Sequence, residues 1–232
     1  MADELILAIE TSTGCGGVSL TRGDVHDGRL LAEYTLQPEV SHSRRLLGSI
    51  EAMIGTAGVA WADLDAVAVS QGPGSFTGLR IGMAAAKGIT MAAELPLIGV
   101  ATLDALAQQI PAYDCQVCCV LDARKEQVYA AFYQDGGDGC CQRTGDCLVL
   151  SPEALIGRID RPTLLAGPGV RVCAPWAAGH ADIRLAAAGQ FYPRAAMIGF
   201  HAAGLLRAGA ANPGDNLTPV YVRASEAELN LR

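Results

Sequence analysis

The stretch Gln71–Arg80, QGPGSFTGLR, decides how this chain folds. An apolar run, Asp65–Val69, precedes it and is typical of a strand covered on both faces. The residues from Phe76 to about Ala93 indicate a helix. Strand, glycine-rich turn and helix in this order predict an α/β fold, in which the helix begins at the turn.

The glycine turn itself has two interpretations. Free backbone N–H groups and the helix dipole at such a turn can bind an anion, so Gly72 and Gly74 are candidates for phosphate contacts. The turn is not a Walker loop, however, because it lacks the Lys-Ser/Thr ending, and it does not have the GxGxxG spacing. The alternative, which we favour slightly, is a preformed corner in which Ser75 or Thr77 caps the helix.

Small residues form a stripe on the helix that follows the turn. Gly78, Gly82 and Ala86 lie at positions i, i+4 and i+8, and Gly88 is close by. Each interior glycine costs up to ~1 kcal/mol of helix stability relative to alanine, so close approach of another backbone must compensate. We expect the stripe to pack inside the molecule, while the rest of this helix and the helix predicted at about 41–57 face outward.

A second polar cluster follows the first predicted strand, Leu5–Ile9. It consists of a carboxylate and three hydroxyls, Glu10–Thr13, just before a hairpin. Such groups can hold a metal-bound phosphate, or they can satisfy the backbone of the turn. Both interpretations stay open.

The remaining pattern predicts two consecutive α/β lobes, residues 1–105 and 106–232. The second and smaller lobe would contain a C-terminal helix and an extended tail that can return to the first lobe. Further elements are predicted as strands at 15–20, 30–36, 96–100, 117–121, 127–133, 147–150 and 163–166, and as helices at 102–109, from 152 and at 193–206. Residues 136–145 are predicted as a loop.

The bulk composition restricts the function. The chain has 232 residues, of which 50% are hydrophobic and 18% charged, with a net charge of −7. A protein that wraps nucleic acid alone needs a basic face, and the sequence contains no basic run. The N-terminus lacks the basic start of a signal peptide, and Lys87, Glu94 and Pro96 interrupt the longest apolar stretch. We expect a cytoplasmic protein without a membrane span.

Eight cysteines raise the question of a metal site. Cys115 and Cys118 have CxxC spacing, and Cys140, Cys141 and Cys147 could complete a ligand set. A second CxxC is missing, and residues 116–121 are typical of a buried strand, in which cysteine behaves as a small apolar residue. We therefore favour free thiols over zinc.

Other candidate chemistry is sparse. Asp122 and Arg124 end a predicted strand, where an ion pair is the favoured interpretation. The segment LLAGPGVRV at 164–172 could be a second phosphate loop. The sequence has neither HExxH nor a supported Ser-His-Asp set, so no active site is evident.

Several segments together closely resemble the TsaB family. The match is almost continuous over the first lobe and patchy over the second. The matching segments are LAIETSTGCGGVSL at 7–20, HSRRLL at 42–47, DLDAVAVSQGPGSFTGLRIGMAAAKG at 63–88, PLIGVATLDALA at 96–107, LDARKEQVYAAFY at 121–133 and PVYVRASEAE at 219–228.

This resemblance implies an actin-like, Hsp70-like fold of two RNase H-like lobes. TsaB proteins are subunits of the bacterial machinery that makes threonylcarbamoyladenosine in tRNA. Their catalytic relative TsaD, of the same fold, binds a metal through two histidines after the strand that corresponds to residues 96–100. Thr102 and Leu106 stand at those positions here, and neither replaces imidazole. The resemblance therefore implies no catalytic residue and no metal ligand in this chain.

The resemblance also implies partners. A TsaD-like subunit would bind through the first-lobe helices, a TsaE-like ATPase would join through the complex, tRNA would be held indirectly, and the isolated chain would form a homodimer. The alternative function is an ATP-binding phosphotransferase or hydrolase of the actin-like fold, with weak ATP or ADP and magnesium binding at Glu10, Thr11, Ser12, Gly72 and Gly74. The interface residues implied are Ser43, Leu46, Leu47, Ile50, Met53, Phe76, Arg80, Met83 and Lys87.

Overall fold

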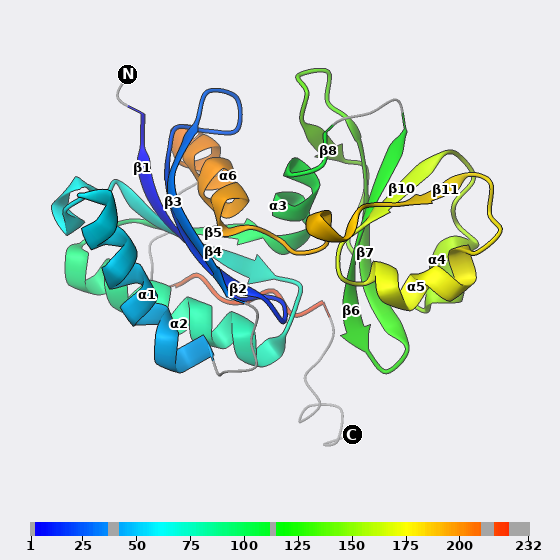
Figure 1. Cartoon of the computed structure of the whole chain (residues 1–232), viewed down its shortest axis with the longest axis horizontal. Coiled ribbons are helices and arrows are strands. Elements are labelled where there is room, and N and C mark those ends of the chain that lie inside the picture. Colours follow the sequence, from blue (N-terminus) through cyan, green and yellow to red (C-terminus); the bar gives the residue numbers. More distant parts are fainter. Residues whose placement is uncertain (1–2, 37–41, 112–114, 210–215, 223–232) are drawn as a thin grey trace. The chain divides into compact units, whose positions relative to one another are not determined.

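The computed structural model of the chain describes residues 3–36, 42–111, 115–209 and 216–222. The chain divides into two compact units (Figure 1). The first unit comprises residues 1–105 and 194–220, and the second comprises residues 106–193 and 221–232. The two-lobed α/β fold expected from the sequence is confirmed.

A five-stranded sheet forms the centre of the first unit. Its strands are β1 (Leu5–Glu10), β2 (Gly16–Arg22), β3 (Arg29–Leu36), β4 (Ala66–Gly72) and β5 (Leu97–Ala101), in the order β3-β2-β1-β4-β5. The first three strands form an antiparallel meander, whereas β4 pairs in parallel with both β1 and β5. This arrangement is that of an RNase H-like lobe, as the resemblance implies.

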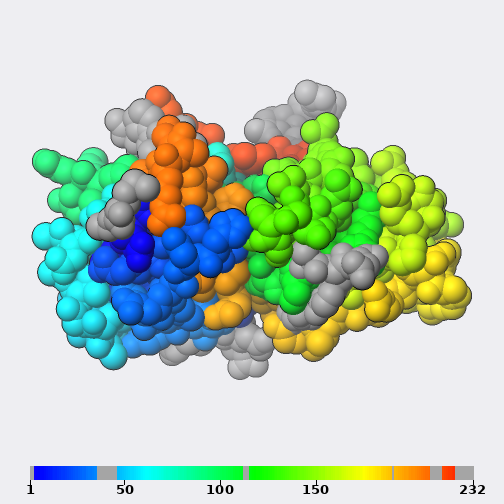
Figure 2. All heavy atoms as spheres, turned by 90° about the horizontal axis from the view of Figure 1, so that it is seen from above, coloured from blue at the N-terminus to red at the C-terminus, as the bar shows by residue number. Residues whose placement is uncertain are grey.

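Helices cover both faces of this sheet, because alternate residues of a strand point to opposite faces. Leu5, Leu7 and Ile9 of β1 pack in a core with α1 (His42–Ala57) and α2 (Phe76–Ala93). Ile6 and Ala8 pack on the other face with α6 (Ala195–Arg207). Figure 2 shows α6, in orange, lying against the blue N-terminal strands.

Polar contacts at both ends hold α6 on the first sheet. At its start, the Glu33 carboxylate accepts hydrogen bonds from the Arg194 guanidinium and from the backbone N–H of Ala196. At its end, Arg207 bonds the carboxylates of Glu4 and Asp24. The sequence-based division at residue 105 placed this helix in the second lobe, whereas its apolar face is buried on the first sheet. Tertiary packing of this kind cannot be read from local periodicity.

The second unit contains a six-stranded sheet whose path is β11-β10-β6-β7-β8, with β9 paired to β7. Four of its elements were not predicted: β8 lies within the expected loop, and α5, β11 and the short helix η2 were not foreseen. Between β5 and α6 the chain forms α3 (Thr102–Gln108), β6 (Gln116–Arg124), β7 (Gln127–Asp135), β8 (Cys141–Arg143), β9 (Leu148–Leu150), α4 (Pro152–Ile156), β10 (Thr163–Ala166), α5 (Val170–Ala177), β11 (Ile183–Leu185) and η2 (Ala188–Gln190). The short helix η1 (Trp61–Asp63) belongs to the first unit and precedes β4. Within the described ranges, no helix is both long and apolar enough to cross a bilayer.

The start of α2 lies directly on the end of β1. A β-carbon at position 78 would lie 2.0 Å from the carbonyl oxygen of Thr11, and one at position 82 would lie 2.2 Å from its hydroxyl oxygen. That hydroxyl donates a hydrogen bond of 2.8 Å to the carbonyl of Gly78. The prediction that the small stripe packs internally is therefore confirmed. Gly88 differs, because a β-carbon there would meet no described atom within 4 Å apart from its chain neighbours and the nearby backbone of α2 itself.

The two kinds of glycine in α2 should respond oppositely to alanine. We expect Gly78→Ala to lower the free energy of unfolding by about 2–3 kcal/mol, because its methyl group would overlap a backbone carbonyl. Gly88→Ala, the matched control in the same helix, should raise it by up to ~1 kcal/mol. Denaturant unfolding followed by circular dichroism measures both changes. A neutral Gly78→Ala would show that the close contact is not required.

Candidate functional site

The carboxylate of Glu10 lies at the end of β1 and is fully buried. Its Oε1 accepts hydrogen bonds from the backbone N–H of Ser12, at 2.6 Å, and from the Ser12 hydroxyl. Its Oε2 has no partner among the residues that the structure describes. Burial raises the pKa of Glu10 from 4.5 to about 7, although hydrogen bonds from Ser12 and Ser70 oppose this shift.

The three predicted nucleotide ligands at the end of β1 are only partly brought together. Glu10 has the strand parity of Ile6 and Ala8, which face α6. The Ser12 hydroxyl bonds the Glu10 carboxylate, and the Ser12 carbonyl accepts the N–H of Ser75 at 2.6 Å. Thr11 contacts α2 instead, through its hydrogen bond to Gly78. Their role as nucleotide ligands stays a prediction.

The glycine turn fits a structural corner better than a phosphate cradle. A β-carbon at Gly72 would lie 2.7 Å from the carbonyl oxygen of Val220, and one at Gly74 would lie 2.3 Å from that of Ser12. Carbonyl oxygens carry partial negative charge and would repel a phosphate at these positions. Ser75 caps α2, as predicted, because its hydroxyl accepts the N–H of Gly78 at 3.3 Å.

The second glycine segment, between β10 and α5, is also filled by protein. A β-carbon at Gly167 would lie 2.4 Å from the carbonyl oxygen of Val120. The N–H of Gly169 donates to the same oxygen at 2.9 Å. At the end of β6, Asp122 accepts the backbone N–H of Arg124 at 2.7 Å and closes a turn, so Asp122 has a local structural role there.

The positions that correspond to the TsaD histidines are both buried. Thr102 and Leu106 are each 0% exposed, and the Thr102 hydroxyl has no hydrogen-bond partner within the described part of the chain. A threonine hydroxyl and a leucine side chain offer no imidazole nitrogen, so the donor set does not fit a histidine-bound metal.

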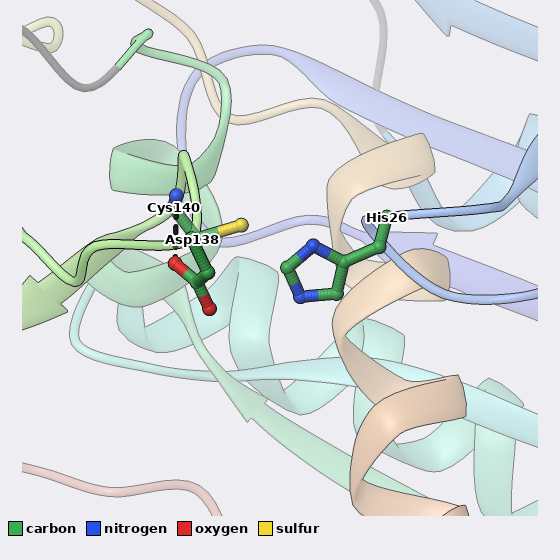
Figure 3. Close-up of side chains that lie close together, drawn as sticks. All are labelled: His26, Asp138 and Cys140. Carbon is green, nitrogen blue, oxygen red and sulfur yellow. Dashed lines mark hydrogen bonds between the residues drawn. The ribbon is translucent and has the colours of Figure 1, made fainter.

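None of the eight cysteines, which all lie in the described ranges, forms a disulfide. Burial raises the pKa of Cys118 well above its usual value and those of Cys141 and Cys173 to about 11, so these thiols are less acidic than exposed cysteines. Near Cys141, the Asp138 carboxylate accepts the backbone N–H of Cys140 at 3.0 Å and so stabilises the turn before β8 (Figure 3).

The outer face of α1 and α2 contains a groove of about 700 Å³, lined mostly by apolar and small residues. Its lining residues are Leu47, Ile50, Glu51, Trp61, Ala62, Ala84, Ala85, Gly88, Ile89, Ala92 and Ala93. Helices α1 and α2 and the short helix η1 all contribute to it. We call this surface the α1/α2 face.

The structure divides the predicted interface residues into two groups. The side chains of Leu46, Ile50, Met53 and Met83 are at most 8% exposed and pack in the core beneath α1 and α2. We therefore remove Leu46, Met53 and Met83 as partner contacts, because helical periodicity marks an apolar face without showing which side it packs on. Ile50 packs in the core and also lines the floor of the groove. Ser43 lies in α1, but its side chain is outside the described residues.

The second group reaches the surface. Leu47 is 58% and Phe76 37% exposed, the Arg80 guanidinium lies 3.9 Å from the centre of the Phe76 ring, and Lys87 is half-buried. Sequence reasoning missed Met91, which is 82% exposed, and Trp61, which is 41% exposed. Continuing the helical stripe through Arg80 and Lys87 would have found Met91. Trp61 lies in η1, for which no sequence signal was recognised.

The buried carboxylate should make the stability of the chain depend on pH. Because the pKa of Glu10 is about 7 in the folded state and near 4.5 when exposed, the folded state binds more protons between these values. Stability is therefore lost as the pH rises through this window. Between pH 5 and 8 we expect wild type to lose about 2–3 kcal/mol more than Glu10→Gln. Glu153→Gln, at an exposed position, should behave like wild type, and parallel pH profiles for wild type and Glu10→Gln would contradict the assignment.

Comparisons with known proteins agree on one family. The family model described as "TsaD: tRNA N6-adenosine threonylcarbamoyltransferase" matches residues 30–230. The chain is 37% identical to the tRNA threonylcarbamoyladenosine biosynthesis protein TsaB of Escherichia coli over 75% of this chain and 72% of that protein. It is 30% identical to TsaB of Bacillus subtilis over 96% of both chains.

Solved structures give the same result. YeaZ from Pseudomonas aeruginosa superposes with a TM-score of 0.77 at 28% identity, covering 94% of this chain and 100% of that one. A second structure, described as a protein with similarity to peptidase YEAZ from the same organism, has a TM-score of 0.79 at 28% identity, with 95% and 100% coverage. The chain thus belongs to the TsaB family of tRNA threonylcarbamoyladenosine biosynthesis proteins.

Proposed function

We propose that this chain is a non-catalytic subunit of the machinery that makes threonylcarbamoyladenosine in tRNA, and that it binds a TsaD-like catalytic subunit through the α1/α2 face. The observation that carries the proposal is the groove on that face, which the exposed Leu47 lines, together with the exposed Phe76 and Met91 of α2. Apolar side chains of this size that gather on one surface are typical of protein interfaces.

Small residues support a helical partner at this face. Gly88 of α2 lines the groove, and a β-carbon there would meet no described atom within 4 Å apart from its chain neighbours and the nearby backbone of its own helix. Gly48 and Gly55 of α1 are open in the same way, although they do not line the groove. Interior helical glycines cost up to ~1 kcal/mol each, and nothing in the first unit offsets that cost here. A partner helix that packs closely against these positions would offset it. The proposed interface therefore combines open backbone with exposed apolar anchors.

The proposed non-catalytic role is supported by the residue types at two positions rather than by the fold. Thr102 and Leu106 occupy the positions at which the catalytic relatives carry metal-binding histidines, and both are buried. We expect the TsaD-like subunit to supply the metal and the transfer chemistry. A TsaE-like ATPase would join through that complex, and the net charge of −7 supports only an indirect role in holding tRNA.

The same face should support a homodimer when the chain is alone. A second copy would present an equally apolar α1/α2 face, so burying the two against each other removes both from water. Binding of the catalytic subunit and self-association would then compete for the α1/α2 face. In this proposal, both take place in the cytoplasm.

A charge in the groove tests the interface. Leu47→Asp should weaken binding to the TsaD-like subunit by at least about tenfold, because desolvating a carboxylate in an apolar interface is costly. Calorimetric titration of one purified subunit into the other measures the affinity. The Leu47→Asp substitution should also shift the homodimer towards monomer in sedimentation experiments. Leu46→Asp is unsuitable, because Leu46 is 8% exposed and the change would disturb the core.

The matched control is Leu185→Asp, which introduces the same charge at a leucine that is 45% exposed in β11 of the second unit. It should bind like wild type. Equal binding by Leu47→Asp and wild type would remove the α1/α2 face from the proposal. The absence of any complex with wild type, with or without nucleotide, would reject the proposed function.

One observation favours the alternative function, nucleotide binding by the first unit. Oε2 of Glu10 has no partner among the described residues, and carboxylate oxygens are ligands that magnesium ions bind. The glycine turn fits a bound phosphate poorly, because backbone carbonyl oxygens lie close to Gly72 and Gly74. We therefore expect no heat when ATP and magnesium are titrated into the isolated chain. Saturable heat that is lost in Glu10→Gln would establish this alternative instead.

A further inference from the structure

The first unit contains a segment that the proposed function does not use, residues 216–220, which we call the strap. Helix α6 precedes it in sequence and covers one face of the first sheet. Leu217 of the strap, 4% exposed, packs in the core on the opposite face, together with Met83 of α2 and Leu97 of β5. The C-terminal part of the chain thus contacts both faces of this sheet (Figure 1).

Two hydrogen bonds, each accepted by a backbone carbonyl, join the strap to the end of β4. The N–H of Val220 donates to the carbonyl of Gln71 at 2.8 Å. In return, the side-chain amide of Gln71 donates to the carbonyl of Thr218 at 2.9 Å. Gln71 opens the glycine turn that leads into α2, so the strap is bonded to the point from which α2 starts.

Close packing leaves the strap little room to shift. A β-carbon at Gly72, whose φ is +112°, would lie 2.7 Å from the carbonyl oxygen of Val220. One at Gly99 of β5 would lie 2.8 Å from Cδ1 of Leu217 and 2.7 Å from Oε1 of Gln71. The strap, the end of β4 and the edge strand β5 therefore form one packed contact.

From these contacts we infer that the strap is a positioning element for α2. Glycine turns are conformationally permissive, so contacts from outside the turn must hold them in one arrangement. The strap supplies these contacts on the side of β5 and fixes the end of α2 at which Phe76 is exposed. The consequence for partner binding rests on the proposed function, whereas the coupling of strap to helix is a property of the free chain.

The test loosens the strap without changing the α1/α2 face. Leu217→Ala removes its buried anchor, and Gly99→Ala displaces it from β5. Hydrogen exchange of the free chain should become about tenfold faster at the amides of Leu79 and the next turn of α2, and the Kd for the TsaD-like subunit should rise by a similar factor. Thr218→Ala is the control, because it keeps the carbonyl that Gln71 bonds.

Each outcome decides the inference. Unchanged exchange in α2 for both variants would overturn it, as would faster exchange that is equal in α2 and in β1 and β2, which indicates general destabilisation. Faster exchange confined to α2 with an unchanged Kd would overturn the link to the partner surface. If the wild-type chain does not bind the subunit at all, the proposed function fails, while the exchange data still decide whether the strap positions α2.

Discussion

The first unit depends on the close contact between α2 and the end of β1. At Gly78 and Gly82 a β-carbon would lie 2.0 and 2.2 Å from oxygen atoms of Thr11, far inside van der Waals contact, so only glycine lets the helix approach this far. The short distance allows the Thr11 hydroxyl to bond the helix backbone and the Ser12 carbonyl to accept the N–H of Ser75. Groups that could otherwise face a ligand are thereby used to hold a helix on a sheet.

The second unit contains a similar close contact between a glycine turn and a backbone carbonyl. After β10, Gly167 approaches the carbonyl oxygen of Val120 in β6, and the same oxygen accepts the N–H of Gly169 at the start of α5. In both units a strand, a glycine turn and a helix are fixed by the carbonyl of a neighbouring parallel strand. Glycine-rich turns at strand ends therefore serve packing in each lobe, and their presence alone does not indicate a nucleotide.

The sequence was sufficient for most of the first unit, because its strands and helices carry strong local signals. The caps, the meander and the internal packing of Gly78 and Gly82 follow from rules that act over a few residues. The side of each helix that faces the core does not, which is why Leu46 and Met83 were taken for surface residues. The elements missed in the second unit are the short strands β8 and β11, the short helix η2 and α5. The two strands are stabilised by pairing with neighbours rather than by a long local pattern.

Helix α2 carries two constraints at once, and its glycines separate them. The buried pair, Gly78 and Gly82, is required by the approach to Thr11. Gly88 has no such requirement in the first unit, yet it weakens the helix by up to ~1 kcal/mol relative to alanine. An exposed glycine inside a helix costs stability, and close approach of a partner helix would explain its presence. Gly88 thus supports the argument for a partner at the α1/α2 face, which rests on the groove that Gly88 lines.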